Sequence, residues 1–161
     1  MTEQSAPQSA TGSRPSPSAA RSPDRERAQS QADRLRWARD LGEKLKDIET
    51  LSATTIVEIA RRAGERLRFG GLKMNQIRRF LTELREIESM LKHNPEEINL
   101  QDRVILLRPK LAYAAGRQRE VRPFMEILDP AIKGVSTRKG FDNLLHVVES
   151  IVAYHRYYGG E

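Results

Sequence analysis

The chain has 161 residues, a formal net charge of +6 at pH 7 and no cysteine. This length suits about one domain, and the lack of cysteine excludes disulfide bonds, thiolate metal sites and cysteine nucleophiles. No stretch approaches the roughly 20 apolar residues of a membrane-spanning helix, and the N-terminal residues lack the apolar run of a signal peptide, so the sequence predicts a cytoplasmic protein.

Residues 1–33 predict a disordered polar tail. Met1 is the only large apolar side chain among them, and Pro, Ser, Ala, Gln and Arg dominate. Such a segment cannot bury enough apolar surface to offset the entropy lost on ordering. Its four basic residues balance its four acidic ones, so the net charge of +6 belongs to residues 34–161, the predicted folded domain. A positively charged domain attracts polyanions.

From residue 34 onward, apolar residues recur at helical spacing and no segment alternates like a strand. The predicted helical segments are 34–48, 52–70, 75–92, 100–116, 120–133 and 137–158. They predict an all-α protein, a compact bundle of five to six helices in which short loops favour antiparallel neighbours. The most regular apolar stripe consists of Ile77, Phe80, Leu81, Leu84, Ile87 and Leu91.

Prolines, glycines and hydroxyl residues mark the helix ends. Thr50 or Ser52 is the expected N-cap of the second helix, and Gly70-Gly71 its end, because glycine tolerates the left-handed conformation. Pro109 falls inside the fourth segment. Either that helix kinks there, or one helix ends near Leu107 and another begins with Pro109 in its first turn.

The sequence contains few side chains whose spacing suits catalysis. His93 is expected to interact with a helix C-terminus, whereas His146 and His155 lie nine residues apart on one helix and point in different directions. Ser136-Thr137 is interpreted as a helix N-cap, and no phosphate-binding loop of the GxxxxGK type occurs. We therefore expect no enzyme, no cofactor and no metal site. A metal-dependent nuclease is the enzymatic alternative, and it predicts RNA loss that EDTA abolishes.

Basic residues form three clusters beside the predicted apolar faces. The candidate RNA-binding residues are Lys73, Arg78 and Arg79, then Arg108, Lys110, Arg117 and Arg119 with Arg122 nearby, then Arg138 and Lys139. If the bundle brings them together, they make a stripe that follows a nucleic-acid backbone. Each of these basic residues could instead only keep the domain soluble. The arginines at 61, 62, 66 and 68 are interpreted as ordinary surface.

Three of the four tyrosines lie at the end of the last predicted helix. Tyr154, Tyr157 and Tyr158 occupy one helical turn, so they cannot all face the core. They could stack bases, but tyrosines at helical spacing more often lie in a core or an interface. We therefore expect at least one of them to be exposed or to contact another subunit.

Segments 72–80, 107–117 and 149–160 together resemble the small helical subunit of Csm complexes, the type III-A CRISPR effectors. The resemblance implies a helical protein without catalytic activity, in several copies beside the backbone subunits that hold the guide RNA. It also implies contact with target RNA and the guide–target duplex through basic residues, Arg156 included. Implied partners are RNA, the large subunit, the backbone subunits and further copies of itself, with no membrane.

The resemblance assigns antiviral defence to the whole complex and a structural, RNA-binding role to this chain. RNA backbone shape and charge would be recognised here, while guide–target pairing reads the sequence elsewhere. The alternative is a helical protein-interaction module whose basic face docks an acidic partner. Competition by short RNA of unrelated sequence distinguishes these two functions, because a dedicated protein-docking face should be indifferent to such RNA.

Overall fold

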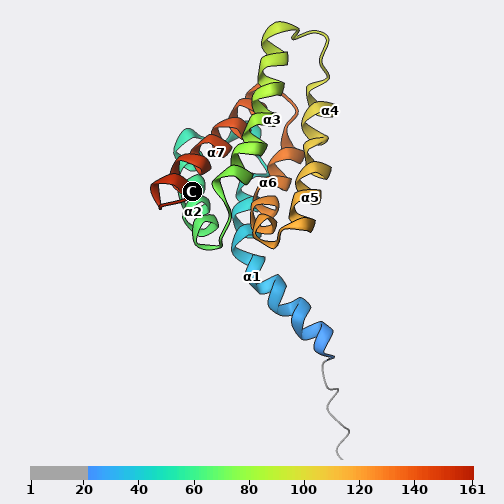
Figure 1. Ribbon diagram of the computed structural model, residues 1–161. Coiled ribbons are helices and arrows are strands. Elements are labelled where there is room, and N and C mark those ends of the chain that lie inside the picture. Colours follow the sequence, from blue (N-terminus) through green and yellow to red (C-terminus); the bar gives the residue numbers. More distant parts are fainter. Residues whose placement is uncertain (1–21) are drawn as a thin grey trace, which may run out of the picture.

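The computed structural model describes residues 22–161, and within this range the chain is helical and contains no strand (Figure 1). The predicted all-α fold is confirmed. The helices are α1 (Pro23–Leu45), α2 (Ala53–Phe69), α3 (Met74–His93), α4 (Leu100–Ile105), α5 (Leu107–Arg117), α6 (Arg122–Gly134) and α7 (Arg138–Tyr157), with 3-10 turns η1 (Ile48–Thr50) and η2 (Arg119–Val121).

The first helix is longer than the sequence predicts. It begins at Pro23, not near Arg34, so residues 23–33 are helical although the sequence predicts a disordered tail there. Pro23 occupies the first turn, where its missing N–H costs little, and Asp24 and Glu26 lie favourably near the positive end of the helix dipole. The rest of the predicted tail, residues 1–21, lies outside the described residues.

The fourth predicted segment divides into two helices at Leu106. Pro109 lies in the first turn of α5, so the second of the two alternatives is correct. The short helix α4 buries only Val104, and its last residue, Ile105, is 39% exposed.

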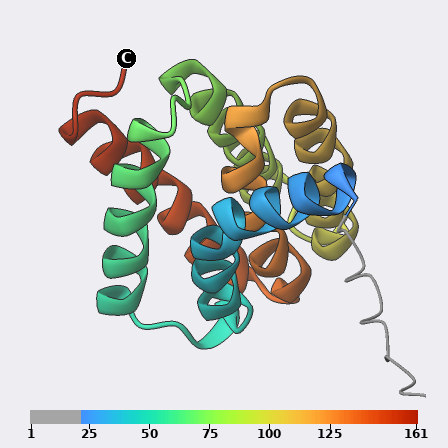
Figure 2. The same cartoon turned by 90° about the horizontal axis from the view of Figure 1, so that it is seen from below.

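The two most extensive helix pairs join segments that are distant in sequence, α1 with α6 and α2 with α7. Figure 2 shows α1 lying across the bundle between α2 and α5. The α1–α6 pair is close because Gly42 has no side chain, and a Cβ there would lie 2.5 Å from the carbonyl oxygen of Glu126. Pro130 deprives that carbonyl of its usual helical donor.

The α2–α7 pair also crosses at a glycine. A Cβ on Gly64 would lie 2.8 Å from both the backbone nitrogen of His155 and the Cβ of Tyr154.

Two predicted N-caps are present at the starts of α2 and α7. The hydroxyl of Ser52 accepts from the N–H of Thr55, and that of Thr137 accepts from the N–H of Gly140.

The chain end folds back onto the start of α3. The carbonyl of Glu161 accepts a hydrogen bond from the N–H of Met74 (2.9 Å). His155 is fully buried, and its Nε2–H donates to the carbonyl of Leu72 (2.8 Å). These two bonds flank Lys73 and hold the backbone on both sides of it.

No helix within residues 22–161 combines the length and the hydropathy needed to cross a bilayer.

Candidate nucleic-acid interface

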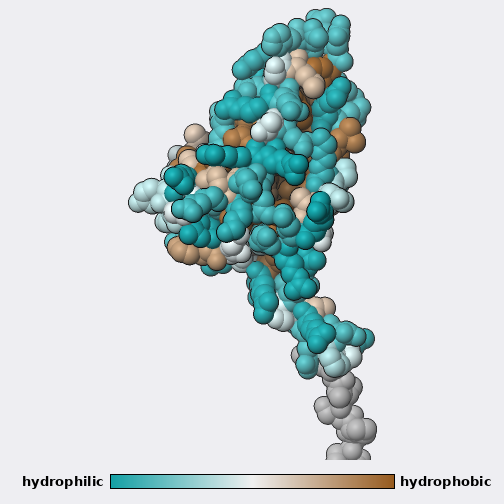
Figure 3. All heavy atoms as spheres, viewed as in Figure 1, coloured by the Kyte–Doolittle hydropathy of each residue, from teal (hydrophilic) through white to brown (hydrophobic). Residues whose placement is uncertain are grey.

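Three of the predicted basic residues meet in one groove between α3 and α5. Lys73 and Arg79 come from the start of α3, and Lys110 comes from α5. The groove has a volume of about 470 Å³, and its floor includes the buried rings of Phe80 and Phe124, which meet edge to face. We call this feature the α3–α5 groove. In Figure 3 the face that carries α3 is covered mostly by hydrophilic residues.

Two glutamines fix the width of the α3–α5 groove. The side-chain oxygen of Gln76 accepts from the N–H of Lys73 (2.7 Å), which caps the first turn of α3. The Nε2 of Gln76 donates to the side-chain oxygen of Gln118, which follows α5. The position of Lys73 is therefore determined by backbone and amide bonds on every side.

The cations of the α3–α5 groove differ in their pairing. Lys110 forms an ion pair with Glu83 on α3. Within the described part of the chain, Lys73 and Arg79 have no carboxylate within salt-bridge distance. Their charge is therefore available to a ligand. Glu83 and Glu120 both line the groove, so three positive groups face two negative ones there.

Arg78 and Arg117 lie outside this groove. Arg78 is exposed on a neighbouring face of α3. Arg117, at the end of α5, places its guanidinium over the ring of Tyr113, 5.7 Å from the ring centre, and Tyr113 is 68% exposed. An exposed arginine on an exposed aromatic ring is a surface on which an unpaired base can stack.

Arg108 joins two helices of the bundle. Its Nε donates to Asp129 of α6 (2.6 Å), and Lys133 contacts the same carboxylate (3.0 Å). Burial raises the pKa of Asp129, but the hydrogen bonds from Arg108 and Lys133 outweigh burial and lower the pKa below its usual value. The charge of Arg108 is therefore largely used inside the protein.

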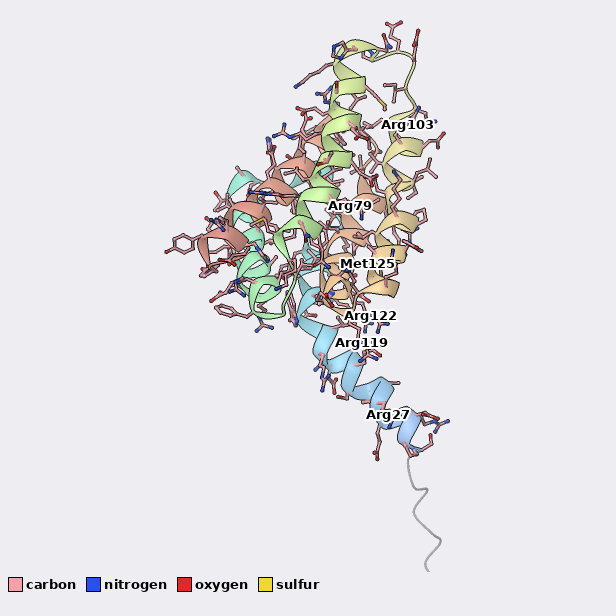
Figure 4. The ribbon with its side chains drawn as sticks, viewed as in Figure 1. Arg27, Arg79, Arg103, Arg119, Arg122 and Met125 are labelled. Carbon is pink, nitrogen blue, oxygen red and sulfur yellow. The ribbon has the colours of Figure 1, made fainter. Side chains whose placement is uncertain are left out.

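Arg119 lies beside the α3–α5 groove, at a second hollow beneath α1. Figure 4 shows Arg79 on α3, then Arg122 and Arg119 below it, and Arg27 on α1 farther down. Arg27 falls in the predicted tail, so the sequence did not bring it into the site. The sequence does contain an indication that Arg27 belongs to this helix, because Arg27, Arg34 and Trp37 recur at helical spacing on one side of α1.

Arg138 and Lys139 are not brought to Lys73 and the α3–α5 groove beside it. They begin α7, and Arg138 pairs with Asp142 one turn later (2.9 Å). Lys73 lies at the opposite end of α7, where Glu161 reaches Met74. A helix of the length of α7 spans about 30 Å, so one ligand contact cannot join the two regions.

The tyrosines at the end of α7 divide by exposure, as expected. Tyr154 is half-buried against the core, whereas Tyr157 is 77% exposed. The rings of Tyr157 and Tyr158 meet edge to face, with their centres 5.0 Å apart. Phe69, at the end of α2, is another exposed aromatic residue at 72%.

Two of the three histidines, His93 and His155, contact backbone carbonyls, whereas His146 is exposed. His93 uses Nδ1 to contact the carbonyl of Ser89 (2.7 Å) at the C-terminal end of α3. Across residues 22–161 no three His, Asp or Glu side chains are grouped so that they could hold a metal ion.

Comparison with known proteins gives a family match that covers most of the bundle. Residues 49–161 match the family model described as Csm2 Type III-A. The matched range runs from η1 to the end of the chain and leaves α1 outside it. No curated protein and no solved structure matches the chain.

Proposed function

This chain belongs to the Csm2 family, the small subunits of type III-A CRISPR effector complexes, and we propose that within such a complex it binds target RNA and the guide–target duplex through the α3–α5 groove and bridges neighbouring subunits. Other Csm subunits are the partners that this family implies. The family is a structural one, so the proposal gives this chain no catalytic step.

One observation supports RNA binding above the others. Lys73 and Arg79 are separated from Lys110 by about thirty residues, yet all three line the α3–α5 groove. Lys73 and Arg79 have no ion-pair partner in the part of the chain that the structure describes. Unpaired cations in a rigid groove attract phosphates at low cost, because no existing ion pair has to be broken.

The chemistry of the groove suits recognition of the RNA backbone. Lys73 presents an ammonium beside the first turn of α3, where the positive end of the helix dipole also favours negative charge. Arg79 presents a planar fork that can bind a phosphate with two parallel hydrogen bonds. Neither group distinguishes one base from another, so affinity should depend on salt and little on sequence.

RNA titration tests this role. Single-stranded RNAs of unrelated sequence should bind with similar affinity, and affinity should fall as salt rises, by about 0.7 log units per log unit of salt for each phosphate contacted. The double substitution Lys73→Gln with Arg79→Gln should reduce that slope by about 1.4, because two contacts are lost. Far-UV circular dichroism and the melting temperature should stay near the wild-type values.

A matched control removes two charges elsewhere. Arg62 and Lys44 are exposed, line none of the hollows described above, and belong to α2 and α1. Arg62→Gln with Lys44→Gln should leave most of the RNA affinity intact. A salt-independent affinity, or equal losses in the two double variants, would refute the groove as the RNA site.

The bridging role is supported by apolar side chains exposed beside the groove. Leu106 is 57% exposed at the α4–α5 junction, and it lines a hollow with Met90 of α3, which is 39% exposed. Tyr157 offers a further contact at the chain end. Exposed apolar and aromatic groups with a polar rim are typical of subunit interfaces. Leu106→Ser should weaken assembly with the other Csm subunits without changing the RNA affinity of the separate chain.

The same basic groove could dock an acidic protein surface instead. Competition distinguishes the two functions, because short RNA of unrelated sequence should compete for an RNA site, whereas a dedicated protein-docking face should be indifferent to it. Incubation of the protein with RNA, with and without EDTA, should leave the RNA intact. Cleavage abolished by EDTA would overturn the non-catalytic role.

A further inference from the structure

The N-terminal half of α1 projects from the bundle (Figure 1). Every residue from 22 to 31 is exposed, and Leu35 is the first buried side chain of the helix. We call Pro23–Arg34 the α1 arm. Helices this short are marginal in water without a packing partner, so the arm gains order if a ligand contacts it.

An open hollow separates the α1 arm from the body of the protein. It has a volume of about 1490 Å³, and its walls come from α1, the end of α2 and the η2–α6 junction. We call it the α1 hollow. Its lining includes five arginines, Arg27, Arg34, Arg66, Arg119 and Arg122.

The guanidinium groups of the α1 hollow are not neutralised by neighbouring carboxylates. None of the five makes an ion pair within residues 22–161. Arg66 instead covers the ring of Trp37 at 5.3 Å, and the Nε of Arg122 donates weakly to the carbonyl of Ala115 (3.4 Å). Three carboxylates also line the hollow, so five positive groups face three negative ones.

The α1 hollow continues the α3–α5 groove. Glu120 lines both, and Gln118 of the groove is next to Arg119 of the hollow. A ligand that leaves Lys73 and Arg79 along this surface therefore meets Arg119 and Arg122 next. Figure 4 shows Arg122 and Arg119 between Arg79 and Arg27 on the face in view.

We propose that the α1 hollow is a second RNA-backbone contact, in which Arg27 and Arg34 of the arm bind phosphates of the same RNA strand that occupies the α3–α5 groove. This inference rests on the proposed RNA-binding function. RNA is favoured over an acidic protein because the hollow adjoins the α3–α5 groove at Glu120 and at Gln118–Arg119, so a single phosphate chain can contact the unpaired cations of both. The guanidinium fork itself binds phosphate and carboxylate alike. The arm lies outside the matched range 49–161, so the contact is an addition to the part of the chain shared with the family model.

Two double variants of the full-length chain test the proposal. Arg27→Gln with Arg34→Gln removes two arm charges that line the hollow. Arg25→Gln with Arg36→Gln removes two charges from the same helix that do not line it. The first pair should lower RNA affinity several-fold and reduce the salt slope by about 1.4, while the second should change both little. Helix content and melting temperature are compared in both.

Hydrogen exchange gives an independent readout. Bound single-stranded RNA should slow amide exchange in residues 24–34 of the wild-type chain and of the Arg25→Gln, Arg36→Gln variant. It should not do so in the Arg27→Gln, Arg34→Gln variant. Protection of the same amides in that variant would overturn the arm contact.

The outcomes separate this inference from the function on which it rests. If the Lys73→Gln, Arg79→Gln variant loses RNA affinity and both arm variants bind like wild type, RNA binding stands and the arm contact is wrong, which leaves the hollow to an acidic protein surface. If the two double variants of α1 lose RNA affinity equally, the loss reflects the lower net positive charge of the chain, and the proposal is also wrong. If the wild-type chain shows no salt-dependent RNA binding, the proposed function itself fails.

Discussion

Gly42 of α1 packs its bare Cα against the carbonyl oxygen of Glu126 in α6, at the point where Pro130 leaves that carbonyl without a helical donor. The contact sets the distance between the two helices. The side chains of Arg39 and Glu126 pair beside it (3.1 Å), so one turn of α1 is fixed by both backbone and side-chain contacts.

Gly42→Ala should destabilise the protein by about 1–3 kcal/mol, because the new methyl group meets rigid backbone and forces the helices apart. Gly116→Ala is the matched control, since a Cβ there has no neighbour within 4 Å. Glycine is unfavourable inside a helix, so the control should be neutral or more stable by up to about 1 kcal/mol. Urea unfolding of both variants measures the difference, and equal stabilities would contradict the close packing.

Glu49 links η1 to the start of α7 and predicts acid sensitivity. Its Oε1 accepts from the N–H groups of Ser136 (2.6 Å) and Thr137 (2.8 Å), and its Oε2 accepts from the Thr137 hydroxyl. Burial raises the pKa of Glu49, but these hydrogen bonds outweigh burial and lower the pKa to about 2.

The unfolded chain therefore binds more protons than the native one at acidic pH. The contribution of Glu49 to stability is present above pH 4.5, its ordinary pKa, and is lost as the pH falls toward 2. Melting temperatures measured across this range should fall more steeply for the wild type than for Glu49→Gln, which should be less stable at neutral pH. Parallel curves would show that Glu49 titrates normally.

His155 predicts a second pH effect, in a higher range. Burial and the nearby charge of Arg68 lower the pKa of His155, although its bond to the carbonyl of Leu72 opposes them. Its Nδ1 is buried and has no hydrogen-bond partner among residues 22–161. Protonation of His155 is therefore easier in the unfolded chain than in the native one. The contribution of neutral His155 to stability is fully present above pH 6.5, its ordinary pKa, and is lost as the pH falls below that value. The pKa of His155, followed by NMR in the native state, should lie below its ordinary value.

Arg108 and Arg117, both predicted RNA contacts, should respond differently to substitution. Arg108→Gln breaks the bond to Asp129 and should cost about 1 kcal/mol of stability, since the pair is partly exposed. Arg117→Glu replaces an exposed guanidinium, which contacts the exposed ring of Tyr113, with a carboxylate, and should change stability by less than about 0.5 kcal/mol. RNA affinity should fall for Arg117→Glu at unchanged melting temperature. A lower melting temperature for Arg117→Glu would assign it a structural role.

Much of the fold could be predicted from helical spacing and end signals. The stripe from Ile77 to Leu91 became the buried face of α3, and Ser52, Thr137 and Pro109 occupy the positions that their chemistry favours. These signals are local, so a single sequence carries them. The helix from Pro23 was missed because its first two turns bury nothing, and apolar periodicity detects only helices that have a buried face.

The site was only partly predictable, because ion pairing is decided by tertiary contacts. Nothing local distinguishes Arg108, which meets Asp129 of another helix, from Arg79, which meets no carboxylate in the described range. The separation of Arg138 from Lys73 likewise depends on the direction of α7. Arg66, interpreted as ordinary surface, lies in the α1 hollow only because α1 crosses the end of α2.

The packing of α1 on α6 has a consequence for the smallest piece of this chain that can fold. The part that matches the family begins at residue 49, but Leu35, Ala38, Leu41 and Leu45 of α1 are buried in the bundle. Cutting the chain at residue 49 would expose the apolar side of α6 that these residues cover, and exposed apolar surface of this kind promotes aggregation. A minimal version for expression should therefore retain the helix from at least Arg34, whatever the family boundary suggests.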